Sequence, residues 1–485
     1  MPDTRVLPPA ALTTERLWLR AVATFALFVA LAGDGLRNLL GLTGYVIVAL
    51  IVTAAVIWFT VRLRPRPLTG PWPLALIGYI LFAVLSLAWS RYPGGSAVTL
   101  VGMLACTALA ILLALVMTWN EIIGALTRAV QAVLALSIVF ELVVALIIRH
   151  PVLPLGVHYD GKPPLLAYWS RNVLFTGDRI QGILGNANLL AFVALLGIIL
   201  FTLRLMGWRG LSPAARAREP HRGVTAGWLA LAVLLFALTR SSTLVLALAA
   251  VVVVAAAALW VRAGAPGKQF PRSVVVGIIF LVGGTAVWLL RDRLFSLLGK
   301  NSDLTGRAEI WDVVIREAQK SPIVGNGFAS PWVPWVEPFN HLVVRNRVLQ
   351  LQAHNTWLDV WMQLGIIGVI LLALALLSAL WRSWFTAIDR PRTGLADANA
   401  FSPYALVPLL ILATLLVQSA AESRPLLESG WVLICLFAFT GVRRPLLDAG
   451  TDLAPDADPQ PRYVRPAEPA EPAEPAGADT RTAHA

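Results

Sequence analysis

Apolar residues along this chain gather in long runs that polar segments separate. Twelve runs stand out, with approximate ends at 17–33, 44–61, 71–89, 96–118, 121–148, 183–206, 224–239, 243–261, 273–290, 356–381, 403–421 and 426–442. A helix needs roughly 20 apolar residues to cross a bilayer, and these runs lack the alternation of barrel strands. The pattern therefore predicts an all-α, polytopic membrane protein with about twelve transmembrane helices.

Composition supports this fold class and excludes others. Of the 485 residues, 58% are apolar and 14% are charged, against about a quarter charged in a typical soluble domain. Because so few charges cannot cover a water-soluble surface, we exclude a soluble enzyme. The net charge of +12 then concerns orientation in the lipid bilayer, and we expect no nucleic-acid partner.

Arginine is concentrated in alternate connections between the runs, as the positive-inside rule describes. The arginines of these rich connections are Arg62, Arg64, Arg66, Arg204, Arg209, Arg216, Arg218, Arg222, Arg262, Arg272, Arg382, Arg390 and Arg392. We therefore predict a cytoplasmic-membrane protein with a cytoplasmic N-terminus (1–16), a transmembrane domain (17–445) and a cytoplasmic tail (446–485). The tail repeats Pro-Ala-Glu and has little to bury, so we predict that it is disordered.

Two connections, 149–182 and 291–355, are long, and the same rule places them on the external side. Both contain Trp, Phe and His, so we expect them to fold. In the second, residues from Thr305 to Gln319 have the spacing of an amphipathic helix. We predict that its apolar face, with Ile310 and Val314, lies on the membrane surface. The turn at Gly325-Asn326-Gly327 has a weak similarity to the start of a phosphate loop.

Arg307 stands in the first turn of that predicted helix, where a cation opposes the helix dipole. Unpaired amides at a helix start together with a guanidinium fork make a good phosphate site. An arginine at the membrane surface also contacts lipid headgroups. The segment alone supports the two interpretations about equally.

The end of the second connection offers a second candidate. His354 precedes the tenth run at its external end, where a histidine can accept a proton near neutral pH. Asn355, Asp359 and Gln363 follow at intervals of four, so they form one polar stripe on an apolar helix. The competing interpretation is a histidine that only bonds backbone at the start of the helix.

Other polar residues have simpler explanations beside the functional ones. Arg179 fits an interfacial anchor, Glu422 has a near neighbour in Arg424, and Asp34 fits a turn between two glycines. Glu141 lies well inside the fifth run, where a carboxylate needs a partner or a proton.

Several motifs follow one another in a fixed order along the chain. They are Arg179-x-x-Gly182 with Gly185-Asn186-x-Asn188, Gly306-Arg307-x-x-x-Trp311, Pro322-x-x-Gly325-x-Gly327-Phe328, and His354-Asn355-x-x-Leu358 with Gly365-x-x-Gly368. In this order, on the external side of about twelve spans, the chain resembles the bacterial O-antigen ligase and polymerase superfamily over roughly residues 120–440.

The resemblance implies a function and a set of site residues. Family members transfer a glycan from an undecaprenyl diphosphate carrier to an acceptor on the outer face of the cytoplasmic membrane. The family's essential arginines match Arg179 and Arg307, its essential histidine matches His354, and a late acidic residue corresponds to Glu422. We therefore expect His354, Arg307 and Arg179 to be catalytic. As substrate-binding residues we expect Arg240, Asn355, Asp359, Glu422 and Glu141.

The expected reaction is inverting and independent of metal, with no cofactor, because arginines supply the electrostatic stabilisation of the leaving diphosphate. The expected partners are the carrier-linked glycan donor and a lipid- or glycan-linked acceptor. The motifs do not separate a ligase from a polymerase of carrier-linked repeats or a protein oligosaccharyltransferase. A transporter or flippase is the alternative from another class, and the sequence lacks the internal repeat of many transporters.

Overall fold

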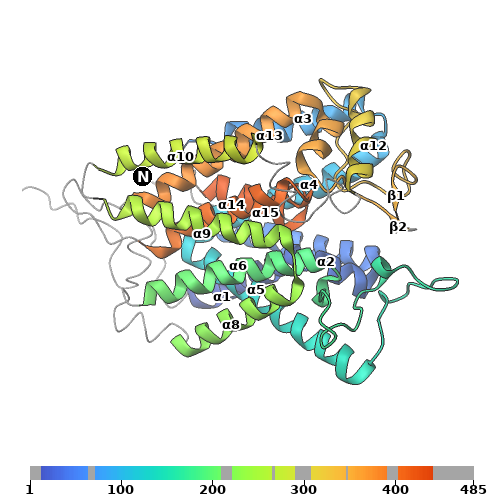
Figure 1. Ribbon diagram of the computed structural model, residues 1–485, viewed down its shortest axis with the longest axis horizontal. Coiled ribbons are helices and arrows are strands. Elements are labelled where there is room, and N and C mark those ends of the chain that lie inside the picture. The colour runs from blue at the N-terminus through green and yellow to red at the C-terminus, as the bar shows by residue number, and fades with distance from the viewer. Residues whose placement is uncertain are drawn as a thin grey trace, which may run out of the picture.

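The structure is a computed structural model, and it describes residues 12–63, 71–208, 221–264, 268–289, 307–345, 348–389 and 402–440. The predicted disordered tail and the residues from 290 to 306 lie outside this part of the chain. Each of the twelve apolar runs contains a helix, and Figure 1 shows the long helices lying side by side.

The helices that fill the bundle follow the apolar runs closely. They are α1 (Leu12–Leu31), α2 (Gly33–Leu63), α3 (Leu74–Leu85) with η1 (Ser86–Trp89), α4 (Pro93–Val116), α5 (Trp119–Val143) with η2 (Val144–Ile148), α6 (Ala187–Gly207), α8 (Arg222–Thr239), α9 (Ser242–Arg262), α10 (Gln269–Leu289), α13 (Thr356–Ile388), η6 (Pro403–Leu406) with α14 (Val407–Ser419), and α15 (Glu428–Thr440).

Shorter elements lie in the connections. They are η3 (Leu165–Ala167), η4 (Gly182–Leu184), α12 (Arg307–Gln319), β1 (Val344–Arg345), β2 (Val348–Leu349) and η7 (Arg424–Leu426). The two strands pair antiparallel, with Val344 opposite Leu349 and Arg345 opposite Val348.

Length and composition qualify seven of the described helices as membrane spans, namely α2, α4, α5 with η2, α6, α8, α9 and α13. Four more apolar helices are shorter, at 74–89, 269–285, 403–419 and 428–440. The prediction of an all-α polytopic membrane protein is therefore confirmed, whereas the count of twelve crossings stays a prediction.

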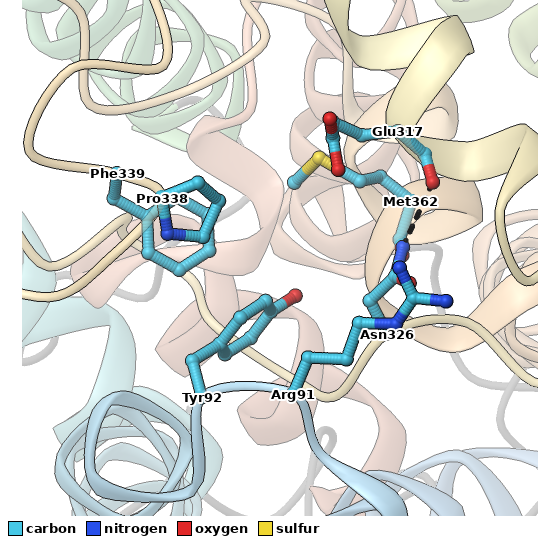
Figure 2. A pocket seen from close by; sticks show the side chains of 7 residues that line it. All are labelled: Arg91, Tyr92, Glu317, Asn326, Pro338, Phe339 and Met362. Carbon is cyan, nitrogen blue, oxygen red and sulfur yellow. Dashed lines mark hydrogen bonds between the residues drawn. The ribbon is translucent and has the colours of Figure 1, made fainter.

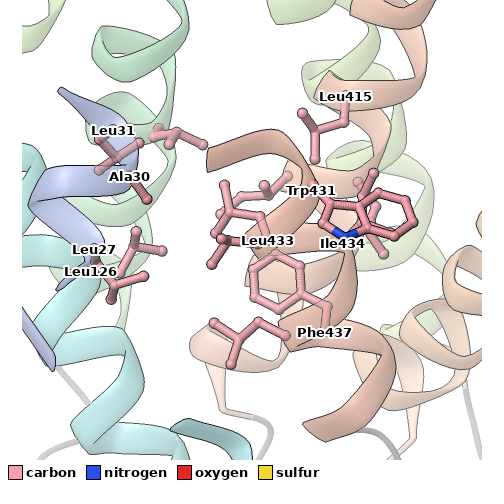
Figure 3. Packing of buried hydrophobic residues seen from close by; sticks show 14 of the residues in the cluster. Leu27, Ala30, Leu31, Leu126, Leu415, Trp431, Leu433, Ile434 and Phe437 are labelled. Carbon is pink, nitrogen blue, oxygen red and sulfur yellow. The ribbon is translucent and has the colours of Figure 1, made fainter. Parts of the chain in front are cut away.

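The core of the bundle is apolar and closely packed around α15. Side chains of α15 such as Trp431 and Phe437 lie between α1 and α5 on one side and α14 on the other, as Figure 3 shows. The helix pairs with the most extensive contact are α6 with α8, α15 with α4, α1 with α5, α13 with α3, and α14 with α9. The described parts of both long connections lie together at one end of these helices, on the right of Figure 1. We call this the loop end.

Helix α12 is present and ends at Gln319 as predicted, but its apolar face is covered by protein. Ile310, Val314 and Ala318 are buried in a second apolar cluster with Trp332 and Phe339 of the following loop. The prediction that this face lies on the membrane surface does not hold, because the loop folds back over it.

Helix α13 is broken at Gly365, whose φ of +61° is outside the helical range. The segment after α12 forms hydrogen bonds with the backbone groups on either side of this break. The backbone N–H groups of Asn326 and Gly327 donate to the carbonyls of Met362 and Gln363, at 3.0 and 2.9 Å. In return, the N–H of Ile366 donates to the carbonyl of Pro322 at 2.9 Å.

These backbone contacts explain why glycine stands at position 325 of the turn and at position 365 of the helix. A Cβ on Gly325 would collide with the backbone of Gln363, and one on Gly365 would collide with the backbone of Ile323. Both glycines also have positive φ, which favours residues without a Cβ. The turn is thus a close backbone contact within the protein, and this contact accounts for both glycines.

Candidate functional site

Glu422 is the centre of a group of hydrogen-bonded side chains at the loop end. Arg307 Nη2 donates to its Oε1 at 3.0 Å, and Asn188 Nδ2 donates to the same oxygen at 2.8 Å. Nδ1 of His354 lies 2.9 Å from Oε2. The Glu422 side chain is 4% exposed, whereas Arg307 and His354 keep 19% and 21%. The carboxylate is therefore hidden, and the guanidinium and imidazole remain accessible to a ligand.

Arg179 joins this group through Asn188. Its Nη2 donates to Asn188 Oδ1 at 2.7 Å, and its Nε donates to the carbonyl of Thr239 at 3.0 Å. Ser241 Oγ lies 2.9 Å from the same Asn188 oxygen. We call Arg179, Asn188, Arg307, His354 and Glu422 the Glu422 cluster. Its members come from both long connections, from α6 and from the segment before α15, so folding brings them together from distant parts of the chain.

Arg240 lies at the edge of this cluster. It ends α8 with a positive φ of +48°, and its side chain is exposed. A Cβ added to Gly177 would lie 3.6 Å from Nη2 of Arg240, which places the guanidinium beside the loop that carries Arg179. The structure thus brings three of the predicted arginines to one end of the bundle.

Several helices begin at the cluster. Asn186 caps α6, Ser241 caps α9 and Asn355 caps α13, each with a side-chain oxygen that accepts from backbone N–H groups of the first turn. Arg307 is the first described residue of α12. Since the N-terminus of a helix carries a partial positive charge, the starts of α6, α9 and α13 favour an anion at this place.

The charges of the cluster also favour an anionic ligand. Burial, together with the charges of Arg171 and Arg307, lowers the pKa of Arg179 against the opposing effect of Asp178 and Glu422. Burial by itself would raise the pKa of Glu422. The hydrogen bond from His354 and the nearby charges of His354, Arg307 and Arg424 outweigh burial and lower the pKa of Glu422. The cluster therefore holds an ionised carboxylate among more positive than negative groups.

The backbone on either side of His354 is fixed. His354 has a φ of +51°, a conformation that is strained for a residue with a side chain. Before it, the carbonyl of Ala353 accepts from Trp311 Nε1 at 3.1 Å. After it, Asn355 Oδ1 accepts from the N–H groups of Trp357 and Leu358. These contacts hold the imidazole ring against Glu422.

Asp359 supports this arrangement from inside the protein. It is fully buried, and its carboxylate accepts from the N–H of Ala353 at 3.2 Å, from Trp332 Nε1 at 2.9 Å and from Gln363 Nε2 at 2.9 Å. Gln363 Oε1 in turn accepts from the N–H of Ala329 at 3.0 Å. Asp359 and Gln363 of the predicted polar stripe thus hold the loop against α13, and Asp359 bonds the backbone of the residue before His354.

Glu141 has an equivalent role for the first long connection. Its buried carboxylate accepts from the N–H of Gln181 at 3.0 Å, from the N–H of Gly182 at 2.7 Å and from Ser170 Oγ at 3.0 Å. These bonds fix the chain directly after Arg179. The structure does not bring Glu141 into the Glu422 cluster, so its contacts fit positioning of Arg179.

Two simpler explanations from the sequence are wrong. Arg424 forms its ion pairs with Asp34 and Glu428, so it is not the direct partner of Glu422. Asp34 also pairs with Arg37, and Arg37 pairs with Glu428, which accepts from Tyr45 as well. Asp34 is therefore part of an ion-pair network between α2 and α15. This network anchors the segment that carries Glu422.

A small hollow lies at the far end of α12. Its walls are formed by Arg91, Tyr92, Glu317, Asn326, Pro338, Phe339 and Met362, which Figure 2 shows. Glu317 follows Arg307 by ten residues on one helix, so the hollow lies roughly 15 Å from the cluster. Asn326 donates here to the carbonyls of Glu317 and Met362. The hollow is thus part of the packing between α12 and α13 and separate from the candidate site.

Asn188 is the member of the Glu422 cluster that is absent from the site residues predicted from the sequence. The signal for it was present, since Asn186-x-Asn188 is one of the ordered motifs. The first asparagine caps α6, and the second bridges Arg179 to Glu422. No spacing rule distinguishes these two roles in advance.

The chain is similar in sequence to a known family and to a curated relative. Residues 225–373 match the family model for O-antigen ligase, a range that includes Arg240, Arg307 and His354. The chain is 26% identical over 317 residues to the "Exopolysaccharide production protein ExoQ" of Rhizobium meliloti (strain 1021), and this alignment covers 63% of the chain and 64% of that relative's length. The apolar helices are those of an integral membrane protein, and residues 225–373 make part of this chain similar to the O-antigen ligase family.

Proposed function

We propose that the protein transfers a glycan from a polyprenyl diphosphate carrier to an acceptor hydroxyl during polysaccharide synthesis. The observation that carries this proposal is the Glu422 cluster itself. A buried carboxylate supports a histidine in one cluster with Arg179 and Arg307, with Arg240 at the edge and the N-termini of α6, α9 and α13 beside it.

The cationic side of the cluster suits the donor. A glycosyl diphosphate is an activated sugar, and negative charge grows on the diphosphate as the C1–O bond breaks. Arg179 and Arg307 stabilise that charge in the transition state, which makes the diphosphate a better leaving group. Because Arg179 already lies among like charges, an anionic ligand relieves their repulsion.

The histidine side of the cluster suits the acceptor. With Nδ1–H donating to Glu422, the lone pair on Nε2 of His354 takes the proton of the attacking hydroxyl. Glu422 then stabilises the imidazolium. The hydroxyl oxygen forms a bond to C1, and the electron pair of the broken C1–O bond leaves with the lipid diphosphate. A direct displacement of this kind inverts the anomeric carbon, and in this proposal it requires no metal ion.

Orientation and the choice of acceptor are also parts of the proposal. The arginine-rich connections would lie in the cytoplasm, so the loop end would face the outside of the cytoplasmic membrane. The name of the ExoQ relative refers to exopolysaccharide production, which favours a polymerase of carrier-linked repeats as the second candidate. Against a transporter, the charged residues of the cluster lie at the ends of helices and not midway along them.

Deletion of the gene tests the proposal. Surface glycans and lipid-linked saccharides would be extracted from the deletion strain and from strains that carry the wild-type gene or a His354→Ala variant. A ligase defect leaves long polymer on its carrier, whereas a polymerase defect leaves single repeats there. Normal surface glycan together with normal carrier-linked pools in the deletion strain would refute both candidates.

A further inference from the structure

The second ring nitrogen of His354 also has a partner in the structure. Nε2 lies 3.3 Å from Oε1 of Gln350. Gln350 directly follows β2, and its N–H donates to the carbonyl of Val343 at 2.9 Å, beyond the paired strands. The side chain of Gln350 therefore stands at the position where an acceptor hydroxyl would meet Nε2.

A second contact fixes the orientation of the Gln350 amide. Its Nε2 donates to the carbonyl of Val348 at 3.1 Å, which turns Oε1 toward His354. An imidazolium has two N–H donors, and here Glu422 and Gln350 offer one acceptor to each. A neutral imidazole that donates to Glu422 has only a lone pair at Nε2. An amide oxygen is a poor neighbour for that lone pair, whereas a hydroxyl is a good one.

We propose that Gln350 accepts from the Nε2–H of the imidazolium that each turnover leaves on His354. Gln350 then occupies the acceptor-hydroxyl position until this proton passes to solvent and the acceptor glycan displaces the amide. This inference rests on the proposed function. Its consequence is protection of the donor from water. In hydrolysis, water would give its oxygen to C1 and a proton to Nε2, and the lipid diphosphate would leave. A water molecule lacks the further contacts with which a glycan can displace Gln350.

The first experiment measures access to Nε2 without any substrate. The purified full-length protein in lipid nanodiscs is treated with diethyl pyrocarbonate, and modification of each histidine is followed by peptide mass spectrometry. We expect His354 to react about fivefold faster in Gln350→Ala than in wild type. This is the rate change that corresponds to the free energy of one ordinary hydrogen bond. Gln350→Met keeps the bulk of the side chain and removes the amide oxygen, so it should also accelerate the reaction.

Controls in the same samples separate this effect from misfolding. His341 and His150 are exposed and serve as internal references. Gln319→Met makes the same substitution on the exposed end of α12 and should leave the rate at His354 unchanged. If modification of His354 is faster in Gln350→Ala but not in Gln350→Met, Gln350 still occupies the acceptor-hydroxyl position. The protection then comes from the size of its side chain. Equal rates at His354 in wild type and both Gln350 variants overturn the proposal.

The second experiment measures hydrolysis. Lipid-linked saccharide extracted from the deletion strain is added to each nanodisc sample without further acceptor, and released free glycan is quantified. We expect several-fold more free glycan with Gln350→Ala than with wild type or Gln319→Met. If Gln350→Ala exposes His354 to the reagent while the wild-type protein neither transfers nor cleaves the saccharide, the proposed function fails and the occupied position stands. If wild type is active but Gln350→Ala releases no extra glycan, the protective role is wrong.

Discussion

Nδ1 of His354 lies 2.9 Å from Oε2 of Glu422, although 68 residues separate the two in the chain. The pair has the form of a base with an orienting carboxylate, in which the carboxylate selects the tautomer and stabilises the charged ring. The whole Glu422 cluster is built around this carboxylate, because Arg307 and Asn188 donate hydrogen bonds to its other oxygen.

Substitution of His354 should remove the reaction and leave the fold. We expect His354→Asn to lose on the order of 10² to 10⁴ in transfer rate, the usual contribution of a general base. Asparagine tolerates the left-handed backbone that His354 adopts at φ +51°, so this variant separates lost chemistry from strain. The measurement is surface glycan per unit of membrane-inserted protein. Near-normal glycan would remove His354 as the base.

Neutralising Glu422 should be nearly as damaging. Glu422→Gln keeps the size of the side chain but loses the charge that stabilises the imidazolium, so we expect a loss of at least about 10² in transfer rate. Glu422→Asp serves as the comparison that keeps the charge and shortens the reach. A Gln variant as active as wild type would mean that the carboxylate serves only to hold the fold.

The same residue predicts a dependence of stability on pH. The pKa of Glu422 is lowered in the folded protein, so its ionised form stabilises the fold at neutral pH. This contribution is complete above the unfolded value of about 4.3 and is lost as pH falls through the lower folded value. Thermal unfolding in nanodiscs should therefore show a smaller loss of stability on acidification for Glu422→Gln than for wild type. Parallel curves would contradict this assignment.

Asn188 should be needed for activity although it donates no catalytic proton. Asn188→Ala breaks the bridge between Arg179 and Glu422, so we expect a fall of about tenfold or more in transfer rate, in line with the loss of bonds to charged groups. Asn186→Ala is the matched control, because it removes only a helix cap. We expect Asn186→Ala to lower thermal stability more than catalytic rate. The reverse order would contradict the division of roles between the two asparagines.

The glycines of the α13 break should be essential for folding. Gly365→Ala and Gly325→Ala each add a Cβ at positive φ against another backbone, which costs on the order of 1–3 kcal/mol in strain before the collision is counted. The amount of inserted protein should fall for both. Gly102→Ala in α4 meets open space and should be tolerated. Normal insertion of Gly365→Ala would show that the break is dispensable.

The sequence predicted the helices well because long apolar runs leave the backbone no alternative in a bilayer. The end of α12 and the caps of α6 and α13 also follow from local rules. The motif residues Arg179, Arg307 and His354 were identified by resemblance, and the structure brings them to one place.

Contacts between distant segments could not be predicted from the sequence. Arg424 is only two residues from Glu422 in the chain. In the folded protein, however, the carboxylate oxygens of Glu422 bond His354, Arg307 and Asn188. The apolar stripe of α12 looks the same whether lipid or protein covers it, and Trp332 and Phe339 pack with it in one buried cluster. Gln350 carries no sequence signal at all, because its role depends on the fold of the segment around β2.

The repaired break in α13 has a consequence for how this protein is made and how it changes over time. Residues 322–327 supply backbone bonds to a membrane helix that follows them in the chain. Because unsatisfied backbone groups in a bilayer cost several kcal/mol each, α13 reaches its final state only once that earlier segment has arrived beside it. The segment and the helix therefore form one unit of biogenesis. A chimera between relatives would have to exchange residues 322–388 together, or else leave the new helix without its hydrogen-bond partners.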